Sequence, residues 1–199
     1  MQLTVGGFDH NLSYLVADAG GEAALIDPTG DPAVLRSAWD SEPRPRVRYI
    51  LVTHGHGDHV ERLAEAREAF PAAEVCGHPG NRYATRKLAD GEVLAVGSGR
   101  IETLYTPGHS RDSVCFLADG EALFTGDTLF MDYVGFARKP ESLYSSLRRL
   151  CKLDGGITVY PGHDYGSAPC RTLAEEKRLN CFLGCPTLDE FKNQLKDMD

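Results

Sequence analysis

The stretch Val52-Thr53-His54-Gly55-His56-Gly57-Asp58-His59 places three imidazoles and one carboxylate within six consecutive positions. The β-branched and aromatic run at 47–52 predicts a buried strand, and the apolar spacing at 60–70 predicts a helix. The cluster therefore lies on a strand-to-helix turn. If the backbone stays extended there, His54 and His56 point to the same side. Neutral imidazoles and carboxylates are ligands for zinc, iron or manganese, so this stretch predicts a metal site.

Three later segments place the same residue types just after predicted strands. They are Thr106-Pro107-Gly108-His109-Ser110, Thr125-Gly126-Asp127-Thr128 and Tyr160-Pro161-Gly162-His163-Asp164. Each segment alone is an ordinary turn, because Pro-Gly and Gly-Asp are common turn formers. Taken with the first cluster, however, they indicate one set of ligands gathered at the ends of several strands.

The rest of the chain alternates short strands with amphipathic segments. Strands are expected at 3–5, 11–17, 23–26, 73–76, 92–96, 101–105, 114–117, 122–124 and 157–160, and helices at 32–39 (with Asp31 as N-cap), 78–88, 141–150, 172–179 and 187–198. The strands form two groups, each with helices, which predicts an α+β fold of two packed sheets covered by helices. No linker or repeat interrupts the chain, so we predict a single domain over 1–199 with a short helical tail from about residue 172.

Composition excludes several classes of function. The 199 residues are 42% hydrophobic and 25% charged, as in a soluble globular protein. With a net charge of −8 and no basic patch, we expect no nucleic-acid partner, and the groups Arg82-Arg86-Lys87 and Arg138-Lys139 are solvated or contact anions. No apolar run approaches the ~20 residues of a membrane span, and the first residues lack a signal peptide, so we expect a cytoplasmic protein without membrane contact.

Six cysteines are present without a CxxC pair, which predicts reduced thiols in that compartment. Cys181 and Cys185 would share a helix face, but Gly184 and Pro186 argue against a helix there.

The combined motifs resemble the metallo-β-lactamase superfamily over nearly the whole chain, and all seven ligand positions of that family are filled. The resemblance implies an αββα sandwich of two mixed sheets with the metals at one edge. It implies one site of His54, His56 and His109, a second site of Asp58, His59 and His163, and Asp127 as the bridge. A third interpretation is a binding or regulatory protein with a vestigial site. The loss of a ligand residue would indicate such a protein, and no ligand residue is lost.

Within the superfamily, the chain is similar to the glyoxalase II and persulfide dioxygenase branch. The segments 11–16, 106–110 and 126–130 resemble its opening strand and its third and fourth motifs. The end of the chain is the most discriminating part: residues 160–165, Thr172, 175–180 and 188–191 resemble the persulfide dioxygenases. Typical glyoxalase II enzymes carry a longer C-terminal region that binds glutathione.

Two departures concern the substrate more than the metal. Met131-Asp132-Tyr133-Val134-Gly135-Phe136-Ala137-Arg138 stands where both families carry a Gly-Cys-Gly-Arg type of segment. Asn180-Cys181 stands where Asn-Pro is usual.

Two reactions fit this ligand set. A dinuclear zinc enzyme would use all seven residues, with a shared hydroxide attacking a thioester and Asp58 orienting it. A mononuclear Fe(II) enzyme would use only His54, His109 and Asp127, with the other four as an outer shell. The tail favours the second, a dioxygenase converting glutathione persulfide and dioxygen to sulfite and glutathione. The alternative is a hydroxyacylglutathione (glyoxalase II-like) or other hydrolase.

The partner implied by either reaction is a small thiol-derived substrate. Arginine side chains match carboxylates geometrically, so Arg82, Arg138 and Arg178, with Tyr165, are candidates to contact glutathione. We also allow for a homodimer.

Overall fold

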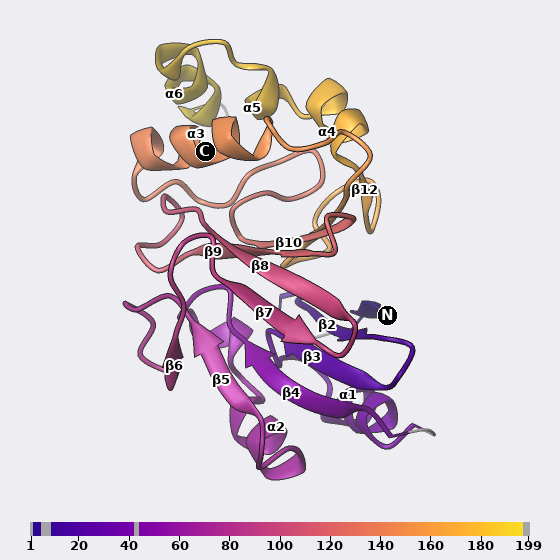
Figure 1. Cartoon of the computed structure of the whole chain (residues 1–199). Coiled ribbons are helices and arrows are strands. Elements are labelled where there is room, and N and C mark those ends of the chain that lie inside the picture. Colours follow the sequence, from indigo (N-terminus) through magenta and orange to yellow (C-terminus); the bar gives the residue numbers. More distant parts are fainter. Residues whose placement is uncertain (1, 5–8, 42–43, 197–199) are drawn as a thin grey trace.

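The structure is a computed structural model that describes residues 2–4, 9–41 and 44–196. Two six-stranded sheets pack face to face, and helices cover the outer side of each sheet (Figure 1). This confirms the predicted αββα arrangement. The predicted strand at 3–5 and the predicted helix at 187–198 extend in part beyond the described residues.

The first sheet contains the strands of the N-terminal half in sequence order. They are β1 (Gln2–Thr4), β2 (Leu12–Ala17), β3 (Glu22–Ile26), β4 (Arg46–Leu51), β5 (Glu74–Gly77) and β6 (Arg86–Lys87). β1 to β3 form the expected antiparallel meander, whereas β3 to β6 pair in parallel. The sheet is therefore mixed.

The second sheet contains the later strands. They are β7 (Val93–Val96), β8 (Gly99–Tyr105), β9 (Val114–Ala118), β10 (Ala122–Gly126), β11 (Thr158–Pro161) and β12 (Arg171–Thr172). Only the β10–β11 pair is parallel, so this sheet is mixed as well.

Three apolar layers hold this arrangement together. α1 (Pro32–Trp39) and α2 (Leu63–Ala69) pack on the first sheet. α3 (Pro140–Leu150), α4 (Leu173–Leu179), α5 (Cys181–Gly184) and α6 (Leu188–Lys196) pack on the second. Between the sheets lies a core to which both contribute, with Tyr14 and Leu51 from one side and Phe116 and Phe124 from the other. Strand alternation explains this, because Leu51 faces the other sheet while Ile50 faces the helices.

The two sheets meet directly at one end. The Val114 amide donates to the Thr53 carbonyl at 2.9 Å, and the Leu12 amide donates to the Gly162 carbonyl at 2.8 Å. The first bond joins the turn after β4 to the start of β9, and the second joins the start of β2 to the turn after β11. The segments that carry the predicted ligands are therefore adjacent.

Two local predictions were wrong. Residues 78–88 form turns and the short strand β6, because the Thr85 and Leu88 amides donate to the Val75 and Gly77 carbonyls of β5. Tertiary pairing here overrides the helical pattern. Residues 181–184 form the short helix α5, whose N-terminus is capped by Asn180. The expectation that Gly184 and Pro186 prevent a helix fails because the helix ends at Gly184.

In the part of the chain that the structure describes, every helix is too short or too polar to cross a membrane.

The burial of the cysteines predicts selective thiol labelling. Burial raises the pKa of Cys76 to about 12 and that of Cys115 to about 11, whereas Cys181 is exposed. At about pH 8, iodoacetamide should therefore alkylate Cys181 in the native protein and spare Cys76 and Cys115 until urea unfolds the chain. Peptide mass spectrometry measures this, and rapid native labelling of Cys76 would contradict the described packing.

Candidate metal centre

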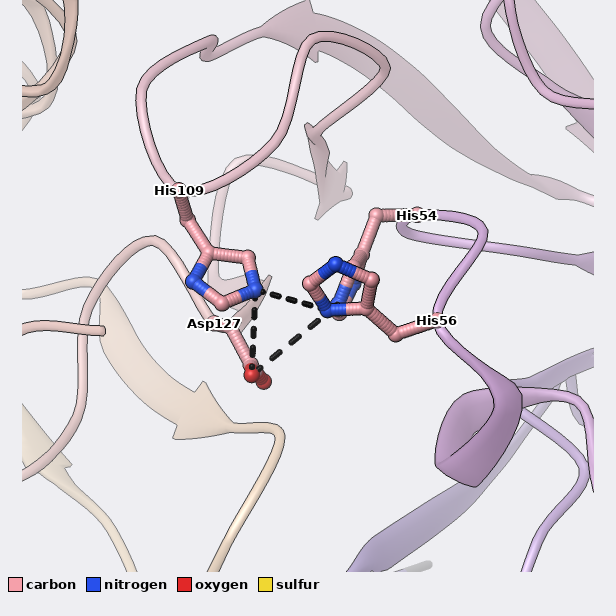
Figure 2. Close-up of side chains that lie close together, drawn as sticks. All are labelled: His54, His56, His109 and Asp127. Atoms are coloured by element: carbon pink, nitrogen blue, oxygen red, sulfur yellow. Dashed lines mark hydrogen bonds and ion pairs between the residues drawn. The ribbon is translucent and has the colours of Figure 1, made fainter. Parts of the chain in front are cut away.

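Four predicted ligands converge where the sheets meet (Figure 2). His54 and His56 follow β4, His109 lies between β8 and β9, and Asp127 follows β10. His56 Nδ1 lies 2.9 Å from His54 Nε2 and 3.0 Å from His109 Nε2. Asp127 Oδ2 lies 3.9 Å from His54 Nε2 and 3.5 Å from His109 Nε2. Such separations are close to the roughly 3.4 Å between donors that surround one ion at about 2.1 Å.

A second group lies against the first and contains Asp58, His59 and His163. Asp58 and His59 lie in a short 3-10 helix (Gly57–His59), and His163 follows β11. His59 Nε2 and His163 Nε2 are 3.3 Å apart, at 3.5 and 3.4 Å from Asp58 Oδ2. Asp127 Oδ1 approaches the same two nitrogens at 3.0 and 3.4 Å. Asp127 thus presents one oxygen to each group.

Asp127 Oδ1 provides a test of whether these residues fit a cation. The atom is buried and lacks a hydrogen-bond partner among the described residues, although two imidazole nitrogens lie close to it. A buried carboxylate oxygen without a hydrogen bond is costly, and a cation would satisfy it. The donor set and this orphaned oxygen both fit a bound metal.

Outer hydrogen bonds aim three of the imidazoles. The Nδ1 atoms of His59, His109 and His163 lie 2.9 Å from Asp27 Oδ2, 3.1 Å from the Phe136 carbonyl and 2.7 Å from the Asp9 carbonyl. Because these acceptors require a proton on Nδ1, they leave each Nε2 lone pair directed into the cluster. This is the usual way in which proteins fix the tautomer of a metal-binding histidine.

The imidazoles of the two donor groups differ in their pKa values. Burial lowers the pKa of His54 and of His109, which keeps both imidazoles neutral. Burial alone would raise the pKa of Asp127, but His59 and His163 hold it well below its usual range. Burial likewise opposes protonation of His163, but Asp127 and Asp58 raise its pKa to about 9. A cation at the second group would compete with that proton, so metal affinity should fall as the pH falls.

A family model described as the metallo-beta-lactamase superfamily matches residues 6–163. The chain belongs to the metallo-beta-lactamase superfamily. The match begins before β2 and ends at His163, so its range includes all seven converging residues.

Similar curated proteins are named hydroxyacylglutathione hydrolase. A hydroxyacylglutathione hydrolase from Francisella tularensis subsp. holarctica is 36% identical over 162 residues, which is 78% of this chain and 63% of that protein. One from Anaeromyxobacter dehalogenans is 42% identical over 165 residues, 79% of this chain and 62% of that protein. The chain therefore spans less than two thirds of the length of these curated relatives.

Solved structures match more of the chain. ETHE1 from Myxococcus xanthus superimposes with a TM-score of 0.88 at 31% identity, covering 100% of this chain and 90% of that one. TTHA1623 in a di-iron-bound form superimposes with a TM-score of 0.76 at 30% identity, covering 92% of this chain and 100% of that one.

Two residues that sequence reasoning missed complete this superfamily site. Asp27 accepts hydrogen bonds from the Thr53 amide (2.8 Å) and hydroxyl (2.6 Å) as well as facing His59. The Asn11 side-chain Nδ2 donates to Asp58 Oδ2 at 3.1 Å. In the sequence, Asp27 resembled only the end of a strand before a proline. The structure reveals its special role through its backbone, because this buried non-glycine residue has a φ of 46°.

The atypical segment at 131–138 forms part of the wall of the site. The Phe136 carbonyl faces His109, and Gly135 packs so closely on the Asp127 carbonyl that any larger side chain would overlap it. The tail holds this segment from behind, since Glu176 accepts from the Asp132 amide at 2.8 Å and Asn180 donates to the Tyr133 carbonyl at 3.0 Å.

Replacing Glu176 with alanine should therefore loosen the segment. Its buried carboxylate also accepts from Asn180 at 2.7 Å and lies 3.3 Å from Arg171. Glu176→Ala should lower the free energy of unfolding by about 3 kcal/mol, because the partner Arg171 is left buried without its full charge compensation. Urea denaturation measures this, with the exposed Glu68→Ala as control. Equal stability of both variants would contradict the described network.

The structure separates the predicted substrate residues. Tyr165 lines an apolar cavity with Phe130, Phe136 and Lys196, and its ring stacks on His163 with centroids 4.6 Å apart. Arg82 and Arg138 line a different, polar cavity beside His56. Arg178 is exposed on α4 and lines neither of these two cavities.

Proposed function

We propose that this superfamily member is a persulfide dioxygenase that holds one Fe(II) through His54, His109 and Asp127. The observation that carries the proposal is the position of the tail. Residues 175–180 resemble the persulfide dioxygenases, and Glu176 and Asn180 of this motif contact the segment that faces His109. The superposition on ETHE1 covers 100% of the chain and so includes this tail.

The proposed reaction consumes glutathione persulfide, dioxygen and water and yields glutathione, sulfite and two protons. The S–S bond breaks, the outer sulfur is oxidised, and dioxygen accepts the four electrons. An Fe(II) ion bound by two imidazoles and one carboxylate would leave coordination positions open for the persulfide sulfur and dioxygen.

The remaining residues of the cluster would then act around the reacting sulfur. Asn11 holds the Asp58 carboxylate, and Asp27 holds His59. His56, His59 and His163 present ring nitrogens to the same space, where they would hold water and guide protons. In this arrangement the chain binds and orients the persulfide, and the Phe136 carbonyl keeps His109 in its ligating tautomer.

The second candidate is a dinuclear hydroxyacylglutathione hydrolase, the name that the curated relatives carry. The observation that favours it is Asp127, whose two oxygens face different donor groups. Two Zn(II) ions would supply a hydroxide for attack on a thioester carbonyl. Asp58 would then both ligate and orient that nucleophile.

For either reaction we propose glutathione as the carrier thiol. The apolar cavity is lined by Tyr165, whose ring stacks on His163 of the second donor group, and by Lys192 and Lys196. Its apolar walls and the Lys196 ammonium suit a thiol peptide with a carboxylate end, whereas Lys192 is already paired with Glu141. Arg178 remains a predicted contact outside this cavity.

Metal analysis of protein grown with both iron and zinc available tests the proposal. We expect about one iron per chain and no cleavage of S-lactoylglutathione. Two zinc ions per chain together with thioester cleavage would replace the dioxygenase with the hydrolase.

A further inference from the structure

The polar cavity beside His56 is a second chamber at the metal centre. It has a volume of about 990 Å³ and extends from Gly55 and His56 to the start of α3 at Ser142. The apolar cavity is instead lined by Tyr165, whose ring stacks on His163. The segment 135–140 separates them, because Phe136 and Ala137 line the apolar chamber whereas Arg138 and Lys139 line the polar one.

Positive charge gathers in the polar chamber, although the chain as a whole carries a net charge of −8. Its walls contain Arg82, Arg111, Arg138 and Lys139 against the single carboxylate of Asp112. Asp112 already accepts a hydrogen bond from the Ser110 hydroxyl at 2.8 Å. The chamber therefore has an excess of cationic groups.

Three of these cations are available to a ligand. Arg82 is engaged, because it donates to the Tyr83 hydroxyl at 2.6 Å and lies over the Tyr83 ring. By contrast, among the residues that the structure describes, no acidic side chain forms an ion pair with Arg111, Arg138 or Lys139. Guanidinium groups in this situation are suited to oxyanions, which they bind through paired hydrogen bonds.

The chamber also touches the reacting centre. His56 lines it, and His56 Nδ1 lies within 3.0 Å of His109 Nε2 in the first donor group. An anion that forms at the first donor group would move past His56 into the polar chamber, where the electrostatic potential favours negative charge. The apolar chamber on the His163 side offers no comparable set of unpaired cations within its described lining.

We propose that this chamber binds a doubly charged oxyanion, and that Arg138 and Arg111 hold it. The proposal rests on the proposed dioxygenase function, in which this oxyanion is the product sulfite. It also divides the work of the two chambers: the Tyr165 side holds the carrier thiol and the Arg138 side receives the oxidised sulfur. A hydrolase would release a singly charged carboxylate there instead.

Inorganic sulfate is the probe, because it is a dianion that needs no turnover. Calorimetric titration of the metal-loaded protein at constant ionic strength should show sulfate binding. Arg138→Gln and Arg111→Gln should each weaken it about tenfold, since each removes charge-assisted hydrogen bonds. Arg100→Gln, the same charge change at an exposed position outside the chamber, should leave the affinity within about twofold of wild type.

Several results would overturn the proposal. Sulfate affinity that is equal in Arg138→Gln, Arg111→Gln and wild type would show that the anion binds the metal or another surface. An equal loss of sulfate affinity in Arg100→Gln would show that the effect comes from the net charge of the protein and not from the chamber. Tighter binding of D-lactate than of sulfate would exclude selection of a dianion. Thermal melts of each variant check that the fold is intact, and failure of dioxygenase turnover would not alter the sulfate titration.

Discussion

Asp127→Ala should abolish turnover and remove metal from the protein. Asp127 presents one oxygen to each donor group, at 3.5 Å from His109 Nε2 and at 3.0 Å from His59 Nε2. It would therefore be a ligand in a mononuclear site and the bridge in a dinuclear one. Loss of a direct ligand should cost more than the roughly 10–100-fold in affinity that loss of an outer partner costs. His54→Ala should behave in the same way.

Metal content after dialysis, measured by mass spectrometry with turnover in parallel, checks this result. Asp189→Ala is a matched control, because it removes an exposed carboxylate from the first turn of α6. The control should keep wild-type metal and activity. Retained activity in Asp127→Ala or His54→Ala would refute the metal-centre interpretation.

Asp27→Ala should have the second largest effect, although Asp27 touches no reacting group. Its buried carboxylate accepts from the Thr53 amide and hydroxyl and holds His59. Removing it leaves buried partners unpaired and should lower the free energy of unfolding by about 3–5 kcal/mol. Metal affinity should fall roughly 10–100-fold, because His59 loses the acceptor that sets its tautomer.

Asp27→Asn separates the loss of the carboxylate charge from the backbone strain that alanine would introduce at this position. Asparagine tolerates the φ of 46° at this position, so this variant removes the charge without the backbone strain of alanine. We expect an intermediate loss of stability in urea and of affinity in chelator competition. Wild-type metal affinity in Asp27→Ala would show that His59 needs no such partner.

Local patterns were sufficient to predict most of the fold. The β-branched and aromatic run at 47–52 predicted a buried strand, and the structure places Leu51 of β4 in one core and Ile50 in another. Asp31 was expected to cap α1, and its side chain accepts from the Ala33 amide at 2.7 Å. The helix predicted at 78–88 was wrong because the backbone hydrogen bonds of this segment go to β5, which no local pattern records.

The candidate ligands could be predicted because each follows a strand in the same way, and strand ends gather at one edge of a sheet. The supporting residues could not. Asp27 lies 32 positions before His59, and only the folded chain brings its carboxylate within 2.9 Å. The substrate residues could not be placed for the same reason. Tyr165 and Arg138 were both expected to contact glutathione, but they line different cavities.

Oxygen uptake by the iron-loaded protein with glutathione persulfide tests the central claim most directly. The dioxygenase account predicts one dioxygen consumed and one sulfite formed per persulfide, with both signals lost in Asp127→Ala. Cleavage of a glutathione thioester by the same preparation without any oxygen uptake would contradict it.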